Sequence, residues 1–133
     1  MRERRWGRVV TIGSSGILQP IPGLALSNSV RGAIASWSKT LADEVAAQGV
    51  TVNMVLPGRI ATDRVAELDA IRANNSGQSV EEIRAASCKT IPLGRYGKPT
   101  EFAAAVAFLC SAQASYITGS MMRVDGGLIR GLG

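Results

Sequence analysis

Two short apolar segments separated by one long segment of helical periodicity constrain this chain more than any other feature. Residues 8–12 are rich in β-branched side chains and end at Gly-Ser-Ser-Gly, and residues 50–56 end at Pro-Gly, so each segment predicts a strand. Residues 24–48 between them predict a long helix. A strand, a helix and a second strand form a crossover unit, which implies a parallel sheet and therefore an α/β fold.

The predicted helix has one apolar face, whose members lie three or four residues apart: Ile34, Trp37, Leu41 and Val45. We interpret Trp37 as a core or interface residue rather than as a platform for a ligand.

Sheets of this kind bind ligands beyond the carboxyl ends of their strands. Ser14 and Ser15 follow the first predicted strand, and the loop of residues 57–62 follows the second. We therefore expect these two loops to form half of a binding cleft.

The second half of the chain predicts helices and one last strand. Residues 63–90 are polar and helical, with a break at residues 74–78 and a capping box at residues 79–82. Residues 99–111 predict a helix with proline in its first turn, and residues 120–124 predict a short strand.

The composition excludes several classes of protein. With 133 residues, of which 46% are apolar, the chain is one globular domain at most. No apolar segment approaches the ~18 residues of a membrane helix, and the first ten residues lack the apolar part of a signal peptide. The chain has no histidine, and Cys88 and Cys110 lack metal-type spacing. We expect a reduced, cytoplasmic protein with no metal and no membrane partner.

The net charge of +5 is concentrated near the amino terminus, in Arg2, Arg4, Arg5 and Arg8. Such a cluster could bind nucleic acid or phosphate, or it could be the solvated end of a helix that leads into the first strand. No nucleic-acid-binding motif accompanies the cluster, so we favour the second interpretation and expect no nucleic-acid partner.

Four motifs follow one another along nearly the whole chain. They are Gly7-Arg8-Val9-Val10-Thr11-Ile12-Gly13-Ser14, Val52-Asn53-Met54-Val55-Leu56-Pro57-Gly58, Ile91-Pro92-Leu93-Gly94-Arg95-Tyr96-Gly97-Lys98-Pro99, and Tyr116-Ile117-Thr118-Gly119 with Val124-Asp125-Gly126-Gly127. In order and spacing these motifs resemble those of the short-chain dehydrogenase/reductase family, and most closely its 3-oxoacyl-carrier-protein reductase type.

The resemblance implies that residues 1–133 form the C-terminal part of a Rossmann-like doubly wound parallel sheet, with three parallel strands that match the fifth, sixth and seventh of the family. The glycine-rich strand–turn–helix that holds the dinucleotide pyrophosphate in the family is not found in this sequence. We therefore expect the 133-residue chain to bind NADP or NAD weakly or not at all. We also expect the strand at residues 8–12 to be an exposed edge.

The resemblance also assigns roles to individual residues. Ser14 matches the serine that holds the substrate carbonyl, although a serine at a strand end can equally bond the local backbone. The catalytic Tyr-x-x-x-Lys of the family is replaced, since Ser27 occupies the tyrosine position and Arg31 the lysine position. These two residues are either remnants of the catalytic pair, with Arg31 a cofactor contact, or ordinary residues of a helix surface.

The loop after the second strand matches the family segment that contacts the nicotinamide of the cofactor. The residues so implied in cofactor binding are Pro57, Gly58, Ile60 and Thr62. The alternative is a plain turn at the end of a strand.

Replacement of the tyrosine has a chemical consequence. A tyrosine hydroxyl has a pKa near 10, which a neighbouring cation lowers, whereas an aliphatic serine hydroxyl ionises poorly near neutral pH. Arginine stays protonated and cannot supply the missing proton. Since general acid–base catalysis contributes ~10² to 10⁴ in rate, we expect at most weak reductase activity from Ser27.

Three functional readings therefore remain, of which we favour the first two. The first is an NAD(P)(H)-dependent oxidoreductase that transfers hydride to or from a small carbonyl or alcohol substrate. The second is a non-enzymatic structural or regulatory subunit that forms oligomers. By resemblance, either would be a homo-oligomer that assembles through the helix of residues 24–48 and through the C-terminal helix and strand. A nucleic-acid-binding module is a third reading, which we do not favour.

Overall fold

The computed structural model describes residues 1–131, and its elements follow the predicted order. The strands and helices are β1 (Gly7–Ile12), α1 (Ala25–Val45), β2 (Val50–Pro57), α2 (Asp63–Ser76), α3 (Val80–Thr90), α4 (Pro99–Cys110) and β3 (Met121–Val124). Short 3-10 turns at Ser15–Ile17 and Ala46–Gln48 lie on either side of α1.

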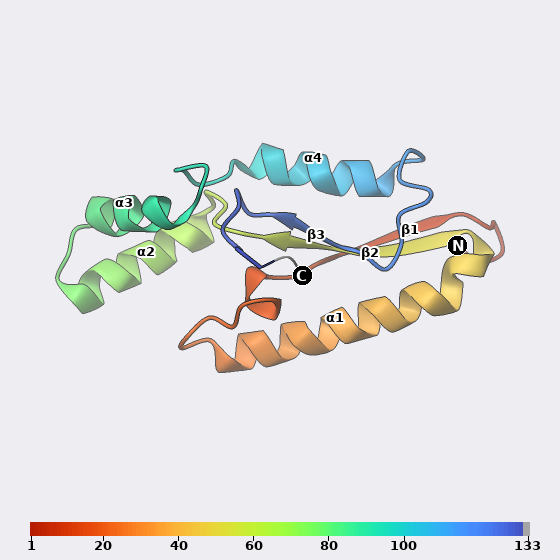
Figure 1. The fold of residues 1–133 in the computed structure, drawn as a ribbon, viewed down its shortest axis with the longest axis horizontal. Coiled ribbons are helices and arrows are strands. Elements are labelled where there is room, and N and C mark those ends of the chain that lie inside the picture. Colours follow the sequence, from red (N-terminus) through yellow and green to blue (C-terminus); the bar gives the residue numbers. More distant parts are fainter. Residues whose placement is uncertain (132–133) are drawn as a thin grey trace.

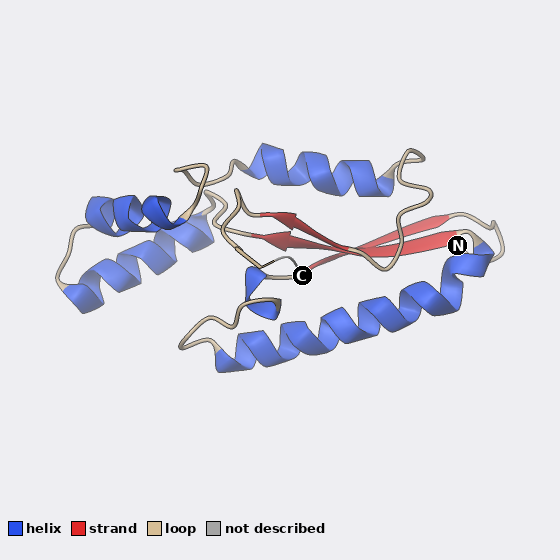
Figure 2. Cartoon of the chain, in the orientation of Figure 1, coloured by secondary structure: helices blue, strands red, loops and turns tan. Residues whose placement is uncertain are grey.

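The three strands form one parallel sheet in the order β1-β2-β3, as predicted. In the register, Val9 pairs with Val52 and Met54 with Met121. Figure 1 shows α1 against one face of the sheet and α4 against the other, with α2 and α3 beyond the carboxyl ends of the strands. The same three-layer arrangement is visible in Figure 2, where the red strands lie between two blue helices.

Alternate residues of the central strand face two separate apolar clusters, because successive side chains of a strand point to opposite faces. Towards α1, Val50 and Val52 pack with Ala42 and Val45. Towards α4, a second cluster is formed by Val55, Leu109 and Ala114. The central strand is buried over all of residues 50–56, as a strand covered on both faces must be.

The predicted apolar face of α1 is confirmed only in its C-terminal half. Val45 is buried and Leu41 packs against the same apolar cluster, whereas Ile34 and Trp37 are 36% and 54% exposed. Ser38 and Ala42, which were not predicted, are also buried. Small side chains face the sheet because they let the helix lie close to it. Trp37 is therefore not a core residue of this chain.

The segment before β3 is held by the buried side chain of Asn53, which is 1% exposed. Its Nδ2 donates to the carbonyl of Ile117 at 2.8 Å, and its Oδ1 accepts from the backbone N–H of Ser120 at 3.1 Å. The backbone N–H of Val52 donates to Oγ1 of Thr118 at 3.1 Å. The motif at residues 116–119 thus has a structural role, since it places β3 beside β2.

The amino-terminal arginines do not form the end of a helix, so that prediction is wrong. Residues 2–5 form a turn, in which Arg5 has a positive φ of 47° and donates to the carbonyl of Ala47 at 3.0 Å. A Cβ atom at position 49 would lie 2.2 Å from the carbonyl oxygen of Arg5, so only glycine fits where the amino-terminal turn lies against Gly49.

Two of the helices after β2, α3 and α4, begin where the sequence predicts. Ser79 and Glu82 form the predicted capping box, which begins α3, and Pro99 lies in the first turn of α4. The predicted break at residues 74–78 is shorter than expected, because α2 continues to Ser76 and ends at Gly77 with a left-handed φ of 68°. Among the described residues, no helix is long and apolar enough to cross a membrane.

Candidate functional site

A cleft of about 790 Å³ opens beyond the carboxyl ends of β1 and β2, where the sequence predicts one. Its walls come from residues within four parts of the chain: 13–31, 57–72, Thr90 and 128–131. These four parts are far apart in the sequence. Its size is typical of a pocket for a small molecule.

Ser14 lies at the β1 side of the cleft and caps the short 3-10 turn that follows it. Its Oγ accepts a hydrogen bond from the backbone N–H of Gly16 at 3.1 Å. Ser14 therefore bonds the local backbone, which is one of the two roles that the sequence left open. In this bond the Ser14 oxygen accepts, so the hydroxyl proton of Ser14 can still be donated to another group in the cleft.

Ser27 and Arg31 are half-buried on α1 and both line the cleft, as their spacing of four residues predicts. The Nη1 atom of Arg31 donates to the carbonyls of Ile12 and Gly13, at 3.1 Å each. Arg31 thereby fixes the start of α1 to the end of β1. These bonds use carbonyl acceptors, so they leave the positive charge of Arg31 without a counter-charge.

Pro57 and Gly58 form the next part of the wall. The N–H of Gly58 donates to the carbonyl of Val124 at 3.0 Å, and a Cβ atom at position 58 would lie 2.6 Å from Cα of Asp125. The absence of a side chain at Gly58 therefore permits close approach of the chain after β3.

Ile60 and Thr62 lie outside the lining of this cleft. Ile60 is buried and forms an isolated bridge with Gly97. Thr62 caps α2, with its Oγ1 accepting from the N–H of Val65 at 3.4 Å, and its side chain is exposed. The structure thus brings Ser14, Ser27, Arg31, Pro57 and Gly58 together in the cleft. Ile60 and Thr62 follow Gly58 in the same loop but do not line the cleft.

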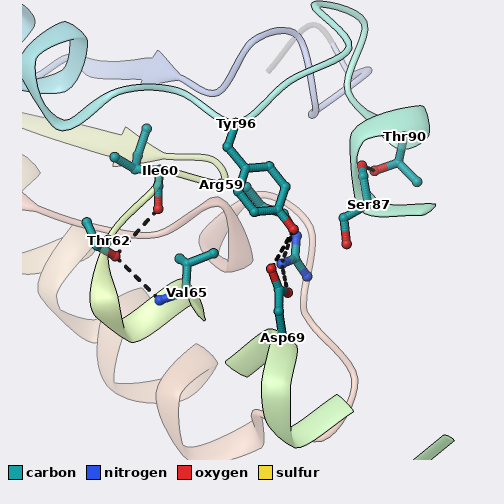
Figure 3. A network of polar contacts seen from close by, with 8 residues as sticks. All are labelled: Arg59, Ile60, Thr62, Val65, Asp69, Ser87, Thr90 and Tyr96. Atoms are coloured by element: carbon teal, nitrogen blue, oxygen red, sulfur yellow. Dashed lines mark hydrogen bonds and ion pairs between the residues drawn. The ribbon is translucent and has the colours of Figure 1, made fainter. Parts of the chain in front are cut away.

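A buried polar network beside the cleft was not predicted from the sequence. Figure 3 shows its members, Arg59, Asp69 and Tyr96, pointing towards one another. Arg59 Nη1 donates to Asp69 Oδ1 at 2.7 Å, and the hydroxyl of Tyr96 donates to Asp69 Oδ2 at 2.7 Å. The same Nη1 atom lies 3.3 Å from the Tyr96 hydroxyl oxygen, and the guanidinium carbon of Arg59 lies 5.6 Å from the centre of the ring. The network joins the loop after β2, α2 and the segment before α4.

Burial raises the pKa of the Tyr96 hydroxyl above its ordinary value of 10, and the hydrogen bond to the Asp69 carboxylate adds to this effect. Tyr96 therefore stays protonated near neutral pH and serves as a hydrogen-bond donor to Asp69. Tyr96 does not line the cleft.

The sequence reasoning also missed a set of arginines that line the cleft: Arg59, Arg64, Arg72 and Arg130. Part of the signal is in the sequence, because Arg64, Leu68 and Arg72 are four residues apart and must share one side of a helix. Their position next to residues 128–131 depends on the tertiary fold.

Comparisons with known proteins show the family of this chain. A family model described as enoyl-(acyl carrier protein) reductase matches residues 1–129. The 3-oxoacyl-[acyl-carrier-protein] reductase FabG of Haemophilus influenzae is 40% identical over 128 residues, which are 96% of this chain and 48% of that protein. The chain thus spans about half the length of the curated relatives it matches.

Solved structures share the fold. The crystal structure of YwfH, an NADPH-dependent reductase involved in bacilysin biosynthesis, matches with a TM-score of 0.90 and 30% identity over 98% of this chain and 50% of that one. A variant of actinorhodin polyketide ketoreductase with NADPH matches with a TM-score of 0.89 and 33% identity over 95% of this chain and 48% of that one. The order of the strands, the position of the cleft and the family match over residues 1–129 lead to one conclusion: this chain belongs to the short-chain dehydrogenase/reductase family.

Proposed function

We propose that residues 1–133 are the C-terminal part of an NAD(P)(H)-dependent oxidoreductase domain, in which the cleft holds a small carbonyl or alcohol substrate beside the nicotinamide. The observation that carries this proposal is that Ser14, Ser27, Arg31 and the Pro57-Gly58 turn line one cleft at the carboxyl ends of the strands. The reductases among the relatives and structural neighbours support it.

The residues of the cleft fit the nicotinamide and its ribose. Apolar side chains, among them Leu24, Val65 and Leu68, offer a surface for a flat ring, and the hydroxyls of Ser14 and Ser27 offer hydrogen bonds. Arg31 keeps part of its guanidinium for a ribose hydroxyl, because only its Nη1 atom bonds the backbone. Pro57 and Gly58 line the cleft and would border the carboxamide, whereas Ile60 and Thr62 lie outside its lining.

In this proposal the bound cofactor supplies or accepts the hydride, and the residues of the chain position the substrate. The Ser14 hydroxyl donates to the oxygen of the substrate carbonyl while its oxygen remains bonded to the N–H of Gly16. Arg31 places a positive charge near the oxygen that becomes negative, which stabilises that charge.

The remaining requirement is a proton for the substrate oxygen. Ser27 can orient a hydrogen bond but is a poor acid near neutral pH, and Arg31 does not release its proton. We therefore propose slow hydride transfer, with the proton delivered by water that reaches the cleft.

A second candidate is a non-enzymatic subunit that forms homo-oligomers. A stripe of exposed apolar residues along α1 favours self-association in either case: Leu26, Val30, Ile34 and Trp37. The open edge of β1 would add to it, because among the described residues β1 pairs with β2 alone. We propose the cytoplasm as the location, since Cys88 and Cys110 are free thiols.

The test uses two ligands. Reduced nicotinamide riboside carries the ring and ribose without any phosphate, and we expect it to shift the amide signals of Ser14, Ser27, Arg31 and Gly58 at millimolar concentration in ¹H–¹⁵N spectra. NADPH and NADH are titrated against the fluorescence of Trp6 and Trp37, and we expect no saturation at micromolar concentration.

Arg31→Ala should weaken binding of the riboside, whereas Arg4→Ala, which removes an exposed arginine in the amino-terminal turn, should not. Shifts spread over other parts of the chain, or no shifts at millimolar riboside, would contradict the enzyme proposal. Stable oligomers without riboside binding would support the second candidate.

A further inference from the structure

The charges that line the cleft are all positive. Five arginines contribute to its walls, Arg31, Arg59, Arg64, Arg72 and Arg130, and the lining contains no aspartate or glutamate. A concave site lined by charges of one sign concentrates ligands of the opposite sign. The contacts of each arginine determine how much of this charge is available to a ligand.

Two of the five arginines are paired. Arg59 is bonded to the buried carboxylate of Asp69 at 2.7 Å, so its charge is largely compensated. Arg64 is paired with Glu67 at 2.5 Å, with both side chains more than half exposed. Because solvent screens an exposed pair, Arg64 can exchange Glu67 for a ligand at little cost.

The other three carry uncompensated charge. Arg31 bonds carbonyl oxygens, and Arg72 and Arg130 form no ion pair with any residue in the range 1–131. Arg72 and Arg130 come from walls that are distant in sequence, namely α2 and the segment after β3. An anion in the cleft would therefore be approached from two walls at once.

The wall that carries Arg130 is held in place by specific contacts. Asp125 accepts from the N–H groups of Gly127 at 2.9 Å and of Ile129 at 3.0 Å, and Arg123 donates to the carbonyl of Gly131 at 2.7 Å. The segment before and after Arg130 is thus fixed to the end of β3. This fixation keeps the Arg130 backbone at the edge of the cleft without any ligand.

The wall formed by α2 is also held in place by specific contacts. Arg64, Leu68 and Arg72 lie four residues apart, so they form one stripe along the cleft side of α2. Asp69, on another side of α2, is bonded to Arg59 and Tyr96, which fixes the rotation of the helix. The stripe therefore presents two guanidinium groups, with an apolar residue between them.

We infer that the substrate of this cleft carries an anionic group, a carboxylate or a phosphate, in addition to its reacting carbonyl or hydroxyl, and that Arg72 and Arg130, assisted by Arg64, bind it. This inference rests on the proposed function for the reacting end of the substrate. Guanidinium groups bind carboxylate and phosphate by paired, charge-assisted hydrogen bonds, which are stronger than bonds between neutral groups.

The experiment compares a charged and an uncharged ligand of nearly the same shape. Acetoacetate and methyl acetoacetate differ only in that the carboxylate is free in one and esterified in the other. Dihydroxyacetone phosphate carries a phosphate in place of the carboxylate and a hydroxyl in place of a methyl hydrogen. Each is titrated into the 133-residue chain, and its binding is followed in ¹H–¹⁵N spectra. We expect at least one of the two anions to bind about 10-fold or more tightly than the ester, with weaker binding as salt rises. The tighter anion identifies the group.

Arg72→Gln and Arg130→Gln should each weaken anion binding by about 10-fold and leave binding of methyl acetoacetate unchanged. The matched control Arg4→Gln also removes one positive charge, but from the exposed amino-terminal turn, and it should weaken anion binding far less. Equal affinity for both anions and the ester, or equal losses in all three variants, would overturn the inference.

A separate titration with reduced nicotinamide riboside distinguishes the two proposals. This ligand carries no anionic group, so Arg72→Gln should not affect it. Anion binding without riboside binding would leave the anionic ligand supported and refute the oxidoreductase proposal. Riboside binding without any preference for an anion would support the oxidoreductase proposal and refute the anionic substrate group.

Discussion

The guanidinium of Arg59 lies 2.7 Å from the carboxylate of Asp69, and this pair joins the loop after β2 to the middle of α2. The side chain of Asp69 is 3% exposed and that of Arg59 is 20% exposed. Removing one partner of such a pair leaves the other charged group without compensation in a place that water hardly reaches. The pair therefore fixes α2, and with it one wall of the cleft.

Asp69→Ala should lower the free energy of unfolding by about 3–5 kcal/mol, because Arg59 then loses its counter-charge. The double variant Arg59→Met/Asp69→Leu, which replaces both partners by apolar side chains, should be less destabilised than Asp69→Ala. Urea unfolding followed by far-UV circular dichroism measures both. A double variant at least as unstable as the single one would contradict this account.

Tyr96→Phe removes the hydroxyl that donates to Asp69 at 2.7 Å and keeps the buried ring. We expect a loss of about 1.5–3 kcal/mol, the usual contribution of a hydrogen bond to a charged group. Tyr116→Phe is the matched control, since Tyr116 is fully exposed and should change stability by less than about 0.5 kcal/mol. Similar losses in both variants would show that the Tyr96 hydroxyl has no special role.

Asn53→Leu should destabilise the chain by at least about 1–3 kcal/mol, although Leu has nearly the same size. The reason is that the carbonyl of Ile117 and the N–H of Ser120 lose their buried partner. Thermal unfolding measures the loss, with Asn75→Leu on the exposed surface of α2 as control. Hydrogen exchange should accelerate most in residues 117–124, and unchanged exchange there would argue against the structural role of the motif.

The pair of Arg95 and Glu101 provides a test by pH. Two hydrogen bonds from Arg95, at 2.7 and 2.8 Å, and one from the N–H of Lys98 lower the pKa of Glu101 from 4.5 to about 2. A lowered carboxyl pKa stabilises the fold above pH 4.5, and this stabilisation is lost as the pH falls towards 2.

Glu101→Gln should therefore lower the Tm at pH 7 and should differ less and less from the unmodified chain between pH 4.5 and 2. Arg95→Gln should reproduce part of this loss with the same dependence on pH. Differential scanning calorimetry from pH 2 to 7 provides the measurement. A difference in Tm that is constant over this range would refute the assigned cause.

Much of the fold follows from the sequence, because local signals determine it. The β-branched residues of β2 predict the strand, and Pro57 and Gly58 mark its end. Ser79 and Glu82 form a capping box, and α3 begins there as predicted. The order of the strands follows from the crossover unit together with the family resemblance.

Other features depend on contacts that no local pattern encodes. The predicted apolar face of α1 holds for Leu41 and Val45, but Ile34 and Trp37 are exposed. Ser38 and Ala42 are buried beside β2 because small side chains let the helix lie close to it. Asp69 lies 10 residues after Arg59 and 27 residues before Tyr96, so these three side chains meet only in the folded chain. The arginines that line the cleft were missed for the same reason, since Arg72 lies on α2 and Arg130 in the segment after β3.

The last prediction concerns the exposed apolar stripe of α1. Val30 and Trp37 are 50% and 54% exposed, and an apolar surface of this kind on a helix is usually covered by another molecule. Val30→Asp should therefore shift the chain towards monomer in sedimentation velocity experiments, because a partner helix would have to bury the new charge.

Ser36→Asp is the matched control, because helical periodicity places Ser36 on another side of α1 and its side chain is exposed. It should leave the oligomeric state unchanged. If Val30→Asp and the unmodified chain sediment alike, α1 is not the interface, and the open edge of β1 becomes the surface that a second copy would cover.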